Sequence, residues 1–68
     1  MRVKLLTNGE FIGLDKCVGK VVEATPFEYV ANLFTVDSSE LLKIGADTYF
    51  VGKNDIPFVF TSDEVEVL

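Results

Sequence analysis

The chain has 68 residues, a single cysteine, no histidine and a net charge of −5 at pH 7. This length suits one domain, residues 1–68, near the lower size limit for a self-supporting core, so the apolar residues, 49% of the chain, are needed first for packing. Without histidine or a second cysteine, the chain lacks zinc-ligand spacing, and Cys17 cannot form an internal disulfide.

The N-terminal part of the chain is predicted to form two strands joined by a long loop. Residues 2–7 alternate so that Val3 and Leu5 share one face. An Asn-Gly turn signal then opens residues 8–19, which we expect to be a long and partly paired loop. The β-branched residues within 20–25 predict the second strand.

Two middle segments carry helix-start signals. Residues 25–28, Thr-Pro-Phe-Glu, place Thr, Pro and Glu as a capping box does, so residues 26–32 are expected as a loop or one helical turn. Residues 33–36 are a strand by composition. Asp37 stands three residues before Glu in a second capping signature, so 38–44 is predicted as a helical turn, with a continuous strand as the alternative.

The last part of the chain is predicted to be a hairpin and a closing strand. Strong β-formers at residues 48–51 predict a strand, with a turn at 52–55 and a returning strand at 56–61. Residues 61–64 repeat the capping arrangement for one 3₁₀ turn, and residues 65–68 end the chain as a strand.

Alternation along these last strands predicts which side chains are buried. Phe58 and Phe60 should share a face, and Tyr49 and Phe50 should point in opposite directions, with one of them in the core. In the closing strand the two valines should lie inside and the carboxylates in water. Five or six short strands with regular turn signals indicate a small closed or nearly closed barrel.

Three segments resemble a known family. They are VGKVVE at residues 18–23, FTVDSSEL at 34–41 and FTSDEVEV at 60–67, and they resemble small SH3-like barrel proteins, several of which are encoded by tailed bacteriophages. The resemblance implies an all-β, SH3-like barrel with one or two helical turns, and a phage or bacterial origin. It implies no catalytic residue. Because the chain has no tryptophan, recognition of proline-rich peptides is not expected.

The inventory of side chains argues against catalysis. Without histidine the usual general base is missing, and no Ser-His or Cys-His pair can form. Phosphate-binding glycine loops and calcium-loop spacing are also missing, so we expect no cofactor, no metal and no enzyme activity. Cys17 is interpreted as a small buried hydrophobe rather than a reactive thiol.

Acidic residues concentrate in the second half of the chain. Residues 1–36 carry four basic and four acidic side chains, whereas residues 37–68 carry seven acidic ones and only Lys43 and Lys53 as basic ones. This excess would repel a phosphate backbone and attract a basic protein partner. The alternative is that the charge serves solubility alone.

The sequence therefore predicts partner binding through loop aromatics and acidic side chains of the closing segment. For the aromatics, capping the open ends of the barrel is the alternative. The candidate partner-binding residues are Phe11, Phe27, Tyr29, Asp63, Glu64 and Glu66.

The hypothesis is a small acidic protein-interaction module in the cytoplasm, which would be the host cytoplasm if the chain is phage-encoded. It would bind a host or phage protein and would not bind membrane or nucleic acid. The alternatives are a DNA mimic that occupies a nucleic-acid-binding protein, and a structural or assembly subunit that associates through strand edges.

Overall fold

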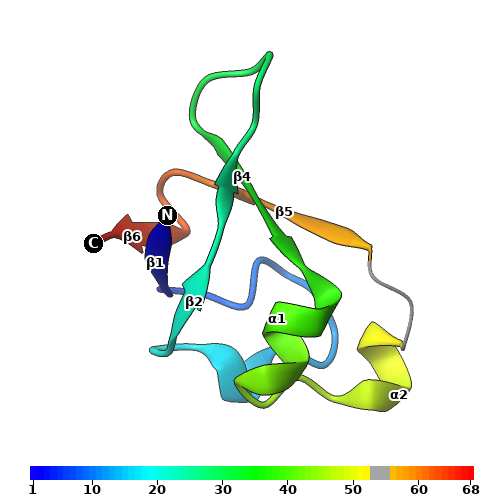
Figure 1. The fold of residues 1–68 in the computed structure, drawn as a ribbon. Coiled ribbons are helices and arrows are strands. Elements are labelled where there is room, and N and C mark those ends of the chain that lie inside the picture. The colour runs from blue at the N-terminus through cyan, green and yellow to red at the C-terminus, as the bar shows by residue number, and fades with distance from the viewer. Residues whose placement is uncertain (53–55) are drawn as a thin grey trace.

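The computed structural model describes residues 1–52 and 56–68. In this part of the chain, six strands form two small antiparallel sheets of three strands each, accompanied by a few short helices (Figure 1). The fold is therefore small and mainly β, as predicted. In chain order the elements are β1 (Arg2–Leu5), η1 (Asp15–Cys17), β2 (Val21–Glu23), β3 (Thr25–Pro26), β4 (Leu33–Asp37), α1 (Ser38–Lys43), α2 (Thr48–Val51), β5 (Pro57–Thr61) and β6 (Val65–Val67).

The first sheet has the order β2-β1-β6. Val3 pairs with Val22 on one side and with Val67 on the other. Val3 and Leu5 are both fully buried, which confirms the predicted alternation of β1. Val67 was predicted to lie inside with Val65, and this is wrong, since Val67 is 51% exposed. It is the last residue of β6, which lies at the edge of the sheet and, among the described residues, has β1 as its one neighbouring strand.

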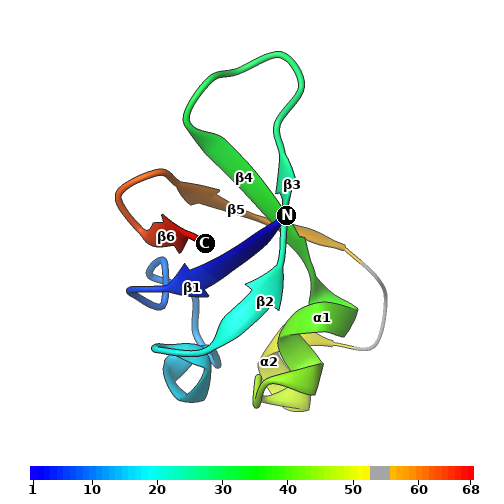
Figure 2. The same ribbon diagram turned by 60° about the vertical axis from the view of Figure 1, so that its left-hand side comes forward.

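The second sheet has the order β3-β4-β5. Its first strand continues from β2, and the buried Ala24 stands between them, so one stretch of chain serves both sheets (Figure 2). At the other end β5 leads into β6 through a tight turn. Within the described residues β5 and β6 are end strands that do not pair with each other, so the sheets do not close.

The turn between β5 and β6 follows the predicted capping arrangement. Glu64 donates its backbone N–H to the Thr61 carbonyl at 3.0 Å, and the Thr61 N–H donates to Glu64 Oε1 at 2.8 Å. The Glu64 carboxylate thus makes one of the two bonds of a capping box, and in the other the Thr61 carbonyl takes the place of its hydroxyl.

The helical alternative for residues 38–44 is confirmed, and the strand alternative is wrong. Helix α1 begins after Asp37 and buries Leu41 completely. Ser38 is also buried, and its Oγ accepts a hydrogen bond from the Ile56 N–H at 3.1 Å. For residues 26–32, a loop or one helical turn was expected. Pro26 ends β3 and residues 27–32 form a loop without a helical turn, so the loop is confirmed.

The strand predicted at residues 48–51 is wrong, because these residues form helix α2. Asp47 caps this helix through a carboxylate that accepts the Tyr49 N–H at 2.9 Å, while its own N–H donates to the Gly13 carbonyl at 2.9 Å. The predicted hairpin is also wrong, since β5 pairs with β4 instead. Of its predicted turn, residues 53–55 lie outside the described residues.

The helix also changes which side chain of this segment is buried. Tyr49 and Phe50 are both exposed and make an edge-to-face contact with centroids 5.0 Å apart, so the prediction that one of them is core is wrong. Val51 is buried instead.

The core lies between the two sheets and under the helices. Phe60 is its largest fully buried side chain, and Phe58 is half-buried on the same face, as predicted. The ring of Phe11 makes edge contacts with both, at centroid distances of 4.9 Å to Phe58 and 5.6 Å to Phe60. The long N-terminal loop is therefore held to the core by an aromatic cluster of Phe11, Phe58 and Phe60.

Candidate partner-binding surface

The structure separates the candidate residues into three places. Phe11 packs in the aromatic cluster, where its ring is committed to core contacts. Phe27 and Tyr29 lie together on the loop between β3 and β4. The three candidate carboxylates lie in the turn before β6 and on β6 itself.

The β3–β4 loop, residues 27–32, projects from the body of the molecule (Figures 1 and 2). Its base is closed by a hydrogen bond from the Phe27 N–H to the Leu33 carbonyl at 2.9 Å. Asn32 has a φ of 67°, a left-handed conformation that asparagine tolerates, and this lets the chain return to β4.

An open groove of about 320 Å³ lies between this loop and the second sheet. Its lining combines loop side chains with residues of all three strands of that sheet. The lining residues are Pro26, Phe27, Glu28, Tyr29, Thr35 and Pro57.

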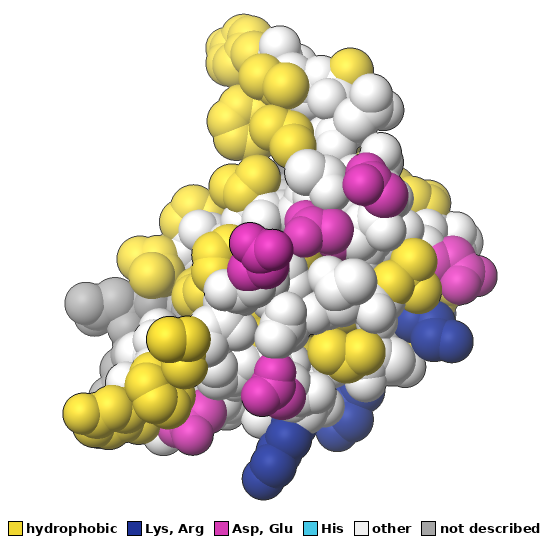
Figure 3. Space-filling model, turned by 180° about the vertical axis from the view of Figure 1, so that it is seen from behind, with side chains coloured by type: hydrophobic (Ala, Val, Ile, Leu, Met, Phe, Trp, Pro, Cys, Tyr) yellow, Lys and Arg dark blue, Asp and Glu magenta, His cyan; other side chains and the backbone are white. Residues whose placement is uncertain are grey.

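Three large hydrophobic side chains on this loop are exposed. Tyr29 is 84% exposed, and Phe27 and Val30 are 39% and 46% exposed. Figure 3 shows hydrophobic side chains gathered on the projecting loop at the top of the molecule. A chain this short needs its apolar residues for the core, so an aromatic group kept in water favours a role in contact with another molecule.

The groove is acidic at its edge. Among the described residues, Glu28 is the only charged one that lines it, and Asp37, opposite Pro57 in the β4–β5 pair, is also exposed. The strands β3, β4 and β5 and the β3–β4 loop contain no lysine or arginine. On the face in Figure 3, acidic side chains lie below the loop, and basic ones lie at the right and lower edges, away from it.

Two of the three candidate carboxylates in the closing segment have neighbours within the protein that reduce their availability to a partner. Glu64 is half-buried and spends one oxygen on the Thr61 N–H. Glu66 lies directly opposite Lys4 in the β1–β6 pair, so a basic residue is its cross-strand neighbour. Asp63 is exposed. These residues do not line the aromatic groove.

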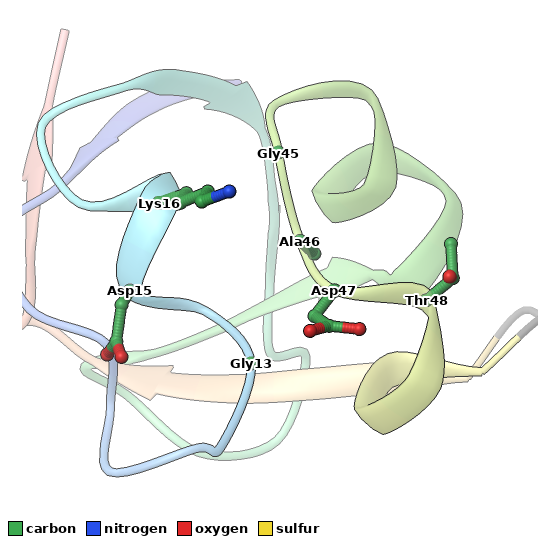
Figure 4. A pocket seen from close by; sticks show the side chains of 7 residues that line it. All are labelled: Gly13, Asp15, Lys16, Gly45, Ala46, Asp47 and Thr48. Carbon is green, nitrogen blue, oxygen red and sulfur yellow. The ribbon is translucent and has the colours of Figure 1, made fainter.

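A second pocket, of about 380 Å³, lies where the N-terminal loop meets the chain between α1 and α2 (Figure 4). Lys16 extends from η1 toward Gly45 and Ala46, whereas Asp15 points away and accepts a hydrogen bond from Asn8 Nδ2 at 2.8 Å. Asp47 is used as the cap of α2. The sequence did not predict this pocket, because segments far apart in the chain form it. Its two acidic side chains, Asp15 and Asp47, are already engaged in local hydrogen bonds.

Cys17 is fully buried, which confirms its interpretation as a core residue. Its Sγ donates a weak hydrogen bond to the Leu41 carbonyl at 3.7 Å. Burial raises the pKa of the thiol above its ordinary value of 9.0, and the charge of Lys20 opposes this shift. The thiolate, which is the reactive form, is therefore disfavoured in the folded protein.

The buried thiol predicts a loss of stability at alkaline pH. The unfolded thiol ionises near its ordinary pKa of 9.0 and the folded one only at higher pH, so unfolding releases a proton in this window. The contribution of Cys17 to the free energy of unfolding should fall as pH rises above 9.0, by up to about 1.4 kcal/mol per pH unit. Urea unfolding across this range, compared with Cys17→Ala, measures it. Parallel curves for the two proteins would contradict the prediction.

Within residues 1–52 and 56–68, no three Cys, Asp or Glu side chains cluster in a way that could hold a metal ion. In the same ranges no helix has the length and apolar character required to cross a membrane. Compared with family models, curated proteins and solved structures, the chain finds no match in any of the three.

Proposed function

We propose that this chain is a small acidic protein-interaction module with an SH3-like arrangement, which binds a host or phage protein and catalyses no reaction. The strand succession supports the arrangement: β6, β1 and β2 form one sheet, and β3, continuing from β2, joins β4 and β5 in the other. A tight turn before the final strand is also typical of that family. The phage origin rests on the sequence resemblance alone.

The observation that carries the proposal is the exposed aromatic loop. Tyr29 contributes nothing to the core, yet it stands beside Phe27 in a groove that the second sheet completes. Aromatic residues with an apolar ring and a polar end are typical anchors of protein interfaces. The acidic surroundings favour a partner with a basic surface.

Strand-edge association receives less support. At the two ends of the β4–β5 pair, the Ser38 N–H donates to the Ile56 carbonyl and the Ser62 N–H donates to the Asn32 carbonyl. In an antiparallel pair the hydrogen-bonded positions alternate, so the backbone N–H and C=O groups of Pro57, Val59 and Thr61 face the outer edge of β5. Proline has no N–H, and the Thr61 N–H is bound by Glu64. Within Pro57–Thr61, the outer edge of β5 thus offers one free N–H, which disfavours pairing with another strand at this edge.

A DNA mimic also receives less support. It requires carboxylates arrayed as phosphates are, whereas Glu64 is bound within its own turn and Glu66 has Lys4 beside it. The exposed hydrophobic loop would have no role in such a mimic.

Affinity capture tests the proposed function. The folded chain, immobilised and exposed to bacterial lysate at low salt, should retain a specific protein that mass spectrometry identifies, and this protein should be lost with Phe27→Ala/Tyr29→Ala. Tyr49→Ala removes an equally exposed tyrosine on α2 and should leave capture intact. Failure to retain any protein at low salt would count against an interaction module.

A further inference from the structure

We propose that the groove beside the β3–β4 loop binds an extended, arginine-containing segment of the partner protein. The arginine side chain would lie between the ring of Tyr29 and the carboxylate of Glu28. This inference rests on the proposed function and adds the chemistry of what the groove recognises.

The size of the groove limits the occupant. At about 320 Å³, it lies at the low end of the range of ligand pockets, about 300–1,000 Å³. It therefore suits one or two side chains of a peptide rather than a folded surface. Its floor is shallow and open, with Pro26, Thr35 and Pro57 from the three strands of the sheet.

The charge of the groove selects a cation. Glu28 lines it and Asp37 lies near its Pro57 end, while no basic residue occurs on the three strands or the loop. Among the described residues, the basic side chains lie elsewhere, on Arg2, Lys4, Lys16, Lys20 and Lys43. Glu28 and Asp37 would repel an acidic segment or a phosphate backbone.

The aromatic side chains favour arginine among the cations. A guanidinium group is planar, stacks on an aromatic ring and still offers N–H donors to a carboxylate at its edge. Tyr29 supplies an exposed ring, and the adjacent Glu28 supplies the carboxylate. A second copy of this chain is a poorer occupant, because a symmetric contact would bring each groove's carboxylates toward those of its partner.

Fluorescence anisotropy with a labelled nonapeptide of alternating arginine and alanine tests the inference. The wild-type chain should bind it, and Tyr29→Ala and Glu28→Gln should each weaken binding by about 10-fold. Tyr49→Ala and Glu66→Gln are matched controls, since each removes the same chemical group outside the groove, and both should stay within about 2-fold of wild type. A peptide with glutamine in place of arginine should not bind.

The outcomes separate this inference from the proposed function. If Glu28→Gln and Glu66→Gln weaken peptide binding equally, the attraction is non-specific and the proposed groove site is wrong. The same holds if Tyr49→Ala alone abolishes binding of the peptide. If lysate capture depends on Tyr29 but the arginine peptide does not bind, the inference fails and the interaction module stands. Concentration-dependent sedimentation that disappears in Tyr29→Ala would identify a second copy as the occupant and overturn the inference.

Discussion

Replacing Phe60 with alanine is expected to lower the free energy of unfolding by about 3–5 kcal/mol. Phe60 is the largest fully buried side chain, and its ring makes an edge contact with Phe11. Removing it leaves a cavity between β5 and the N-terminal loop and takes away one of the two ring contacts that Phe11 makes. Because a chain of this size has a marginal core, the loss should unfold most of the protein.

Urea unfolding followed by circular dichroism measures this loss. Phe60→Leu keeps part of the side chain and gives a folded variant in which a smaller loss, about 1–2 kcal/mol, remains measurable. Phe50→Ala is the control, because this phenylalanine is 53% exposed on α2 and should cost less than about 1 kcal/mol. Similar losses at both phenylalanines would contradict the assigned core.

Gly9→Ala is expected to destabilise the protein by at least about 2 kcal/mol, for two reasons that add. Gly9 has a φ of +61°, a backbone conformation that residues other than glycine adopt only at a cost in free energy. A Cβ atom there would also stand 2.8 Å from Phe60 Cε1 and 3.1 Å from Phe11 Cδ2, so the aromatic cluster would have to shift.

Gly19→Ala separates the two costs. Gly19 has a φ of +85°, but a Cβ atom there meets nothing within 4 Å, so only the backbone cost of about 1 kcal/mol should appear. Adding Gly9→Ala to Phe60→Leu should cost less than adding it to the wild type, because the smaller side chain makes room. If Gly9→Ala and Gly19→Ala cost the same, the close approach of Gly9 to the ring is not what constrains this turn.

The same cluster contains Phe11, a candidate binding residue for which packing against the core was the alternative. Phe11 follows an Asn-Gly turn signal and lies in a loop, as expected, and loop aromatics are reasonable interface candidates. Its ring nevertheless packs on Phe58 and Phe60, which are about fifty residues further along the chain. No local pattern encodes that contact, whereas Phe27 and Tyr29 are 39% and 84% exposed among the described residues.

Helix α2 shows the limit of local propensity most clearly. Thr48, Tyr49, Phe50 and Val51 are all strand formers, and their order alone predicts a strand. The cap from Asp47 and the bond that joins Asp47 to Gly13 hold the segment as a helical turn against the N-terminal loop. An aspartate before residues 48–51 is a helix-capping signal that the sequence contains, but the hydrogen bond of Asp47 to Gly13 on the distant loop has no local signal.

By itself, the sequence determined where β1, β2, β4, β5 and β6 lie and where the closing turn falls, because alternation and turn chemistry act between near neighbours. The alternation at Val3 and Leu5 and the reciprocal bonds of Thr61 and Glu64 need no distant partner to be predicted. Only the tertiary structure decided which aromatics are core, that residues 48–51 are helical, and that Glu28 and Tyr29 share a groove with Pro57. Those outcomes depend on contacts between segments far apart in the chain, and burial there outweighs propensities of a few tenths of a kcal/mol per residue.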